Sequence, residues 1–302
     1  MNPRLAPHLA LFTVGMIYGL NYALAKMVMN GGYLSYSAFI LSRVFYGLLF
    51  FGIATALRRS FKKIDPSDYL RFFLSGVFGV AINQLMFFKG LELTTPVNAS
   101  LIMTNTPVLV IFMSVILGAE RFAWRKMIGL ILGAIGAVLL ITKGLRIEAF
   151  QEINFGDLYV LINASAFALY LIISKPLLRK YSSIQVVTVV FASGFIVVLP
   201  VGAADFLAVD WTSFGVEIWL SFAFVLVFTT GFAYLLNAFA LQKVNPSVVS
   251  IYIYLQPVIA TSSGWWFGQN QILPVHIYSA ILIFTAVFLV SWKNQRNSPK
   301  KN

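Results

Sequence analysis

Residues 184–204 read IQVVTVVFASGFIVVLPVGAA and contain no charged side chain. An α-helix rises about 1.5 Å per residue, so a run of this length crosses the roughly 30 Å hydrocarbon core of a lipid bilayer. The stretch therefore predicts a transmembrane helix, and it decides the class of fold to which the chain belongs.

Nine further apolar runs of similar length lie on either side of this one. Only 11% of the 302 residues are charged, against about 25% in soluble domains. The fold class we predict is an all-α integral membrane protein with ten transmembrane helices. The predicted spans are 9–29, 36–57, 69–89, 98–118, 124–142, 157–177, 184–204, 217–239, 246–268 and 273–292.

The residues that bind metals and form disulfides are nearly absent from the sequence. The chain has no cysteine, which excludes disulfides, thiolate metal sites and a cysteine nucleophile. Its two histidines, His8 and His276, are too few for a multi-histidine site. We therefore expect no metal and no cofactor.

The basic residues divide unequally between the two sides of the membrane. With the N-terminus in the cytoplasm, 17 of the 22 Lys and Arg residues lie in cytoplasmic segments, four lie on the opposite side, and Arg43 lies within a span. Cytoplasmic loops of membrane proteins are enriched in such residues. We predict a multi-pass protein of the cell (inner or plasma) membrane with both termini cytoplasmic. This asymmetry also accounts for the net charge of +12, and we expect no nucleic-acid partner.

The two halves of the chain share similarly spaced residues. A shift of 150 residues aligns Pro96 with Pro246, Pro107 with Pro257, and Gly118 with Gly268. Each half then holds five spans, and an odd number places the second copy in the membrane in the opposite orientation. Inverted repeats are a recurrent transporter architecture. We predict two inverted five-helix repeats around a central cavity, over residues 1–150 and 151–302.

Four short motifs are informative. The first two correspond to each other in the two halves, and the other two each mark one helix. The four motifs are Tyr18-Gly19-Leu20-Asn21-Tyr22 with Lys26, Phe167-Ala168-Leu169-Tyr170 with Lys175, Gly118-Ala119-Glu120, and the glycines Gly129, Gly133 and Gly136. Together they resemble the EamA-domain proteins of the drug/metabolite transporter superfamily over essentially the whole chain. The resemblance implies a central cavity lined by spans one, three, four, six, eight and nine. It also implies transport of amino acids, other metabolites or drugs, commonly outward.

Arg43 is the one charged residue well inside a predicted span. A central arginine costs about 2.5–3.5 kcal/mol on insertion scales, so it should face protein or water. It can bind a substrate carboxylate, or it can extend to the interface or hydrogen-bond freed backbone carbonyls. All ten acidic residues fall in loops or at helix ends. The sequence therefore indicates no mid-membrane carboxylate for proton coupling.

Pro107 and Pro257 occupy equivalent positions in spans four and nine. A proline inside a helix removes one backbone hydrogen bond and crowds the carbonyl four residues earlier. Such carbonyls are tolerated at membrane depth only against protein or a wet cavity. We predict that both prolines kink their helices beside the central pathway; the alternative is a packing kink away from it.

Polar and aromatic side chains recur at helical spacing on several spans, as Asn163 and Tyr170 do on span six. An unpartnered amide in lipid is costly, so these faces should point inward, toward substrate or toward interhelical hydrogen bonds. The predicted substrate-binding residues are Tyr18, Asn21, Arg43, Asn83, Gln84, Asn105, Thr106, Asn163, Tyr170, Tyr234, Asn237, Tyr252 and Gln256.

These features favour an exporter of small metabolites, such as amino acids or drugs, that works by alternating access. The alternatives are a nucleoside or sugar permease of the same superfamily and an intramembrane lipid-modifying enzyme. The sequence lacks a clustered acid/base pair and a phosphate-cradling glycine loop, so we expect no enzymatic activity. The expected partners are a small-molecule substrate and the lipid bilayer, with the chain acting as a monomer or a homodimer.

Overall fold

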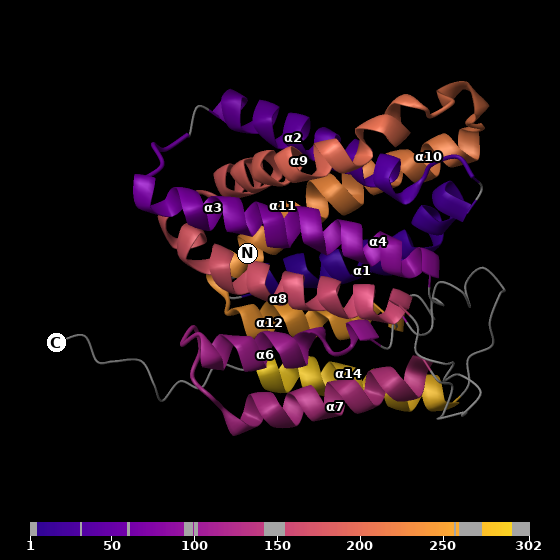
Figure 1. Cartoon of the computed structure of the whole chain (residues 1–302). Helices are drawn as coiled ribbons and strands as arrows, with labels where there is room; N and C mark the ends of the chain where they lie inside the picture. The colour runs from indigo at the N-terminus through magenta and orange to yellow at the C-terminus, as the bar shows by residue number, and fades with distance from the viewer. Residues whose placement is uncertain are drawn as a thin grey trace.

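The computed structural model describes residues 5–30, 32–58, 61–93, 99, 102–141, 155–256, 258–259 and 274–291. Every regular element in these ranges is a helix (Figure 1). In the first half they are α1 (Ala6–Asn30), α2 (Tyr36–Arg58), η1 (Pro66–Asp68), α3 (Tyr69–Gly76), η2 (Val77–Ile82), α4 (Asn83–Leu93), α6 (Thr106–Ile116) and α7 (Trp124–Ile141). In the second half they are α8 (Phe155–Lys180), α9 (Ser183–Leu207), η4 (Trp211–Ser213), α10 (Val216–Phe224), η5 (Val225–Phe232), α11 (Ala233–Lys243), α12 (Pro246–Ile251), η6 (Tyr252–Tyr254) and α14 (Pro274–Ser291).

Some predicted spans are built from consecutive helical pieces. Span three runs through α3, the π-helical η2 and α4, and span eight runs through α10, the π-helical η5 and α11. Five continuous helices of the described chain are long and apolar enough to cross a membrane: Tyr36–Arg58, Pro66–Leu93, Phe155–Lys180, Ser183–Leu207 and Val216–Lys243. With the shorter apolar helices Thr106–Ile116 and Ile277–Val290, they make the chain an all-α, multi-pass membrane protein.

The packing of the helices follows a two-fold relation between the halves. α2 packs on α9, α6 neighbours α12, and α7 packs on α14, so spans two, four and five each meet their own counterparts. α1 of span one packs on α11 of span eight, and α4 of span three packs on α8 of span six. Replacing both spans of the first pair by their counterparts in the other half gives the second pair. Figure 1 shows the α2–α9 pair and the α7–α14 pair on opposite sides of the bundle, with α1, α4, α8 and α12 between them. The fold is therefore that of two related five-helix repeats.

Both repeats also contain the same irregularities. The π-helical segments at 77–82 and 225–232 overlap after a shift of about 150 residues. Span four has a turn at Thr104 and Asn105, and span nine has the 3-10 turn Tyr252–Tyr254. Pro107 follows the first of these turns and stands in the first turn of α6. A backbone N–H at that position has no acceptor within the helix, so a proline there costs no helical hydrogen bond. Pro257 and the predicted boundary between the repeats at residue 150 lie outside the described residues.

Glycines of α7 allow a close approach to its neighbours. A Cβ built on Gly133 would lie 2.3 Å from the Tyr254 ring, and one on Gly129 would lie 2.7 Å from Val290 of α14. Neither separation leaves room for a methyl group. The glycine ridge of span five thus serves packing within one protomer.

We expect Gly133→Ala to lower the melting temperature of the purified protein, because overpacking a close contact costs about 1–3 kcal/mol. Gly52→Ala is the matched control, since a Cβ at Gly52 meets nothing within 4 Å. Alanine is favoured over glycine in a helix by about 1 kcal/mol, so the control should be neutral or stabilising. Scanning fluorimetry in detergent measures both variants, and equal melting temperatures would contradict the close contact.

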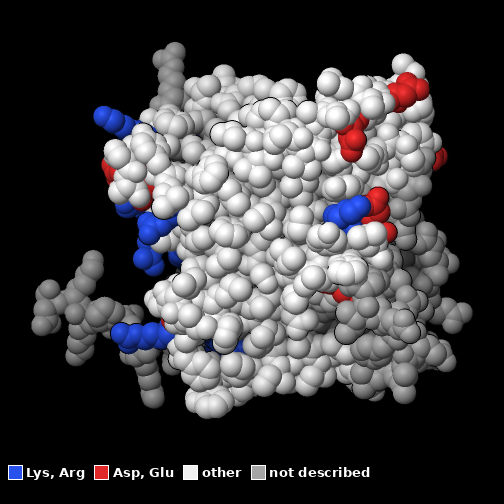
Figure 2. Space-filling view, viewed as in Figure 1, with Lys and Arg blue, Asp and Glu red and all other residues white. Residues whose placement is uncertain are grey.

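Charged side chains lie at the two ends of the bundle (Figure 2). At one end, here called the basic end, Lys180 and Arg71 pair with Asp68, and the Lys62 ammonium lies over the Tyr181 ring. The opposite or acidic end carries the helix-terminal and loop residues Glu92, Asp205, Asp210 and Glu217. The apolar spans thus run between a basic and an acidic end.

Candidate functional site

A cavity of about 110 Å³ lies between the two repeats. Side chains from both halves surround it, and span two joins the six spans that the resemblance implies because Arg43 reaches the cavity from α2. The lining residues are Tyr18, Asn21, Arg43, Asn83, Gln84, Phe87, Phe88, Met103, Asn163, Phe167, Thr229, Tyr234, Ile253 and Gln256. None of them is acidic, so the only formal charge in this lining is positive.

Arg43 is 4% exposed and does not extend to an interface. Its Nε donates a hydrogen bond of 3.1 Å to the Thr230 hydroxyl, and its guanidinium carbon lies 5.2 Å from the centre of the Phe88 ring. None of the ion pairs among the described residues involves Arg43. The guanidinium is thus held in place by a neutral hydroxyl and an aromatic face, with its charge unpaired by any described carboxylate.

A hydrogen-bond chain joins the two repeats at the cavity wall. The Tyr234 hydroxyl donates to the carbonyl of Gly79 over 3.2 Å, and Gln84 Nε2 donates to the same hydroxyl over 3.1 Å. Gln84 and Tyr234 are 150 residues apart, which is the shift that relates the repeats. Residues at equivalent positions can meet only near the two-fold axis, so this pair marks that axis.

Two further amides of the lining are fixed by neighbouring helices. Asn163 of α8 donates through Nδ2 to the backbone carbonyl of Asn83, and the Thr229 hydroxyl of η5 donates to Asn21 Oδ1 over 3.1 Å. Asn163 is almost fully buried. These contacts hold the amides on the cavity wall and limit how each can turn.

A second, smaller cavity of about 20 Å³ adjoins the first. Tyr18, Phe167, Ile253 and Gln256 border both, and the smaller one also contains the predicted residues Asn237 and Tyr252. The Tyr252 hydroxyl lies 2.8 Å from His8 Nδ1 of α1. The smaller cavity therefore extends the site between α1, α8, α11 and α12.

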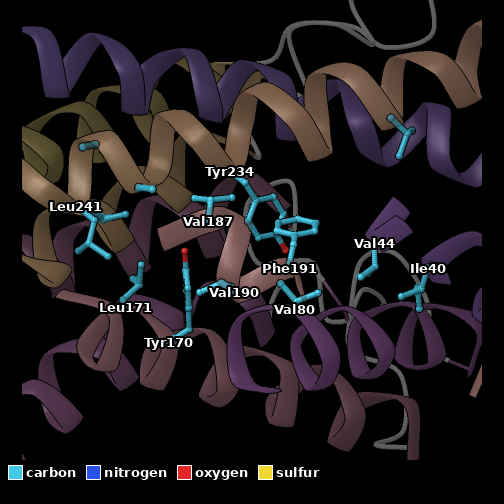
Figure 3. Packing of buried hydrophobic residues seen from close by; sticks show 14 of the residues in the cluster. Ile40, Val44, Val80, Tyr170, Leu171, Val187, Val190, Phe191, Tyr234 and Leu241 are labelled. Carbon is cyan, nitrogen blue, oxygen red and sulfur yellow. The ribbon is translucent and has the colours of Figure 1, made fainter. Parts of the chain in front are cut away.

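The structure places eight of the thirteen predicted residues on the main cavity, namely Tyr18, Asn21, Arg43, Asn83, Gln84, Asn163, Tyr234 and Gln256. Asn105 is exposed and donates to the carbonyl of Ile102, while Thr106 is buried at the start of α6. Tyr170 belongs to the hydrophobic cluster that includes Val187 and Val190 of α9 (Figure 3). These three residues do not line either cavity.

The predicted set lacked Phe87, Phe88, Met103, Phe167, Thr229 and Ile253, which the structure adds to the main cavity. Thr229 and the Arg43 partner Thr230 had a usable signal, because two adjacent hydroxyls interrupt the apolar run VLVFTTGF of span eight. Phe87 and Phe167 also had one, because each lies four residues after a lining amide, Asn83 or Asn163, and so shares its helical face.

Comparison with known proteins places these features in a family. The chain matches the EamA-like transporter family over residues 5–142 and 154–292. It is 24% identical to an uncharacterized transporter of Methanothermobacter thermautotrophicus, over 97% of this chain and 88% of the relative. It is also 24% identical to the uncharacterized transporter YyaM of Bacillus subtilis (78% of this chain, 76% of the relative) and to a WAT1-related protein of Arabidopsis thaliana (95% and 87%).

A solved crystal structure has the same fold. It superposes with a TM-score of 0.73 at 18% identity and covers 94% of this chain and 95% of its own. The two matches to the family, one for each five-helix repeat, together span nearly the whole sequence. The chain belongs to the EamA-like transporter family.

Proposed function

We propose that this transporter exports a small metabolite that carries a carboxylate, such as an amino acid, by alternating access between its two repeats. The observation that supports this most directly is the cavity between the repeats, in which Arg43 is the only charged residue of the described lining. A carboxylate there would receive charge-assisted hydrogen bonds, which are about twice as strong as neutral ones. The aromatic walls would hold the apolar part of the substrate. Export, as opposed to import, rests on the resemblance to the family.

Contacts at the basic end support alternating access. Glu120, between α6 and α7, accepts hydrogen bonds from the Ser247 backbone N–H over 3.0 Å and the Ser247 hydroxyl over 2.7 Å, and it pairs with Lys126. Lys175 donates to the carbonyls of Leu241 and Val244. Both sets hold the segment that joins span eight to span nine. We propose that these contacts close the basic end in this conformation and must break when it opens.

Uptake into liposomes that contain the purified protein tests the proposed function. The panel should contain radiolabelled amino acids, simple carboxylates, nucleosides and sugars, with protein-free liposomes as the control. Saturable uptake of a carboxylate-bearing solute supports the proposal. Transport restricted to nucleosides or sugars would favour the permease alternative, and modified lipid without any uptake would favour the enzyme.

We expect the basic end to face the cytoplasm, because Lys and Arg are enriched in cytoplasmic segments. The chain has no cysteine of its own, so single cysteines report cleanly. Lys62→Cys and Arg179→Cys should resist a membrane-impermeant maleimide in intact cells, whereas Glu217→Cys at the acidic end should react. Strong labelling of either of the first two in intact cells would contradict this orientation.

A further inference from the structure

Two side chains of the described cavity lining each carry a buried acceptor oxygen that accepts no hydrogen bond from the described residues. Gln84 Oε1 and Asn163 Oδ1 are buried and have no partner among the described residues. Both residues line the main cavity, Gln84 from α4 and Asn163 from α8, and these helices pack against each other. A buried acceptor left unpaired costs about 1–3 kcal/mol, so two of them in one wall call for an explanation.

The orientation of the Gln84 amide follows from its partner. A tyrosine hydroxyl has one hydrogen, and that of Tyr234 is used on the Gly79 carbonyl. The hydroxyl can therefore only accept from Gln84, which must turn its NH₂ group toward it. Gln84 Oε1 is then the atom left without a partner.

The orientation of the Asn163 amide follows in the same way. Its partner is the backbone carbonyl of Asn83, which can only accept a hydrogen bond. Asn163 must present its NH₂ group there, and Oδ1 is left over. In both residues a neighbouring oxygen accepts from the amide NH₂ group, and the amide oxygen is left over. Both amide oxygens therefore remain as acceptors for donors of a substrate.

A substrate held by Arg43 could supply those donors. The described residues of the cavity lining include no carboxylate to neutralise an ammonium group. Amide oxygens and aromatic faces can nevertheless bind an ammonium without a formal counter-charge. Phe87 and Phe167 of the same two helices add aromatic rings to this lining. The wall thus offers the contacts for a primary ammonium, and Arg43 offers those for a carboxylate.

We infer that Gln84 Oε1 and Asn163 Oδ1 bind the primary ammonium of a zwitterionic substrate whose carboxylate lies at Arg43. This inference rests on the proposed function and deepens it, because it makes these two amides the residues that distinguish an amino acid from the same acid without its amino group. A plain carboxylate would leave both oxygens unpaired.

The test uses pairs of probes that differ only in the ammonium group: L-phenylalanine with 3-phenylpropanoate, and L-leucine with 4-methylpentanoate. Dissociation constants are measured by calorimetry on the full-length protein in detergent. We expect the wild-type protein to bind the amino acid of at least one pair about tenfold or more tightly, the effect of one charge-assisted hydrogen bond. In Gln84→Met and Asn163→Leu, the ratio between the dissociation constants of the two probes of that pair should fall toward one.

A control variant separates recognition from folding. Gln84→Glu keeps an acceptor at the same position and adds a negative charge, so it should retain or increase the preference for the amino acid. A purely structural role would weaken both probes of a pair equally and leave their ratio unchanged.

Equal binding of both members of each pair by the wild-type protein, a ratio unaffected by the substitutions, or no binding of any of the four probes would overturn the inference. Liposome uptake of 3-phenylpropanoate without preference for phenylalanine would contradict the inference alone. Absence of uptake of every solute in the liposome panel would contradict the proposed function itself.

Discussion

Arg43→Met is expected to weaken binding of 3-phenylpropanoate and phenylalanine by about ten- to 150-fold and to remove most of their transport. Hydrogen bonds to charged groups contribute about 1.5–3 kcal/mol, which corresponds to that range of affinity. Methionine should fit the site without unfolding it, because no described carboxylate pairs with Arg43 and none would be left uncompensated. Thr230 would keep its bond to the Val225 carbonyl.

Two comparisons make the Arg43 result specific. Arg43→Lys keeps the positive charge but loses the planar guanidinium that contacts Phe88, so its affinity should lie between those of Arg43→Met and the wild type. Arg71→Met removes a 44% exposed arginine at the basic end and should bind normally. Calorimetry and liposome uptake provide the readouts, with melting temperatures as the check on folding. Wild-type affinity in a folded Arg43→Met protein would show that Arg43 does not bind the substrate carboxylate.

The spans, their number and the repeat could be predicted because their signals lie in the sequence itself and do not depend on how the helices pack. A run of apolar residues identifies a membrane helix from its own composition, and the aligned pair Pro107 and Pro257 needs no knowledge of packing. The polar lining was also largely accessible to prediction. Amides such as Asn83 and Asn163 cannot face lipid without a partner, so their position follows from physical chemistry.

The π-helical segments could not be predicted from periodicity. Thr229 and Tyr234 both line the cavity although they are five residues apart. In a regular α-helix that spacing places two side chains about 140° apart around the axis. The π-helical register of η5, with its i to i+5 pairing, brings them back toward one face. A search for helical stripes therefore finds Tyr234 with Asn237 and misses Thr229.

Asn21 and Tyr170 show a second limit of the sequence. A shift of 149 residues aligns them, yet Asn21 lines the cavity while Tyr170 packs so tightly against Gly79 that a Cβ there would lie 2.2 Å from its ring. In inverted repeats, equivalent positions lie toward opposite sides of the membrane, Asn21 toward the acidic end and Tyr170 toward the basic end. The closure of the basic end proposed above would account for this difference, and no single-sequence pattern specifies which end is closed.

The strongest candidate for holding the basic end closed is Glu120, whose side chain is 4% exposed and bonded to Ser247 and Lys126. We expect Glu120→Gln to shift the protein toward a state open at that end. The glutamine NH₂ group must replace either Oε1, which accepts from the Ser247 backbone N–H, or Oε2, which accepts from the Lys126 ammonium. In either case a donor would face a donor, so at least one contact is lost. A lost buried contact of about 1–3 kcal/mol changes the ratio of open to closed forms by about five- to 150-fold.

A single cysteine in the smaller cavity, Asn237→Cys, can measure this opening, because Asn237 is buried there beside Val249 and Tyr252. In inside-out vesicles, an impermeant thiol reagent should modify it faster when Glu120→Gln is also present. Glu92→Gln is the matched control, since Glu92 is a 51% exposed partner of Lys89 at the acidic end and should leave the rate unchanged. Modification at the control rate in Glu120→Gln would mean that Glu120 does not hold the basic end closed. A faster rate would instead assign this carboxylate, which lies outside the cavity lining, to the step that exposes the site.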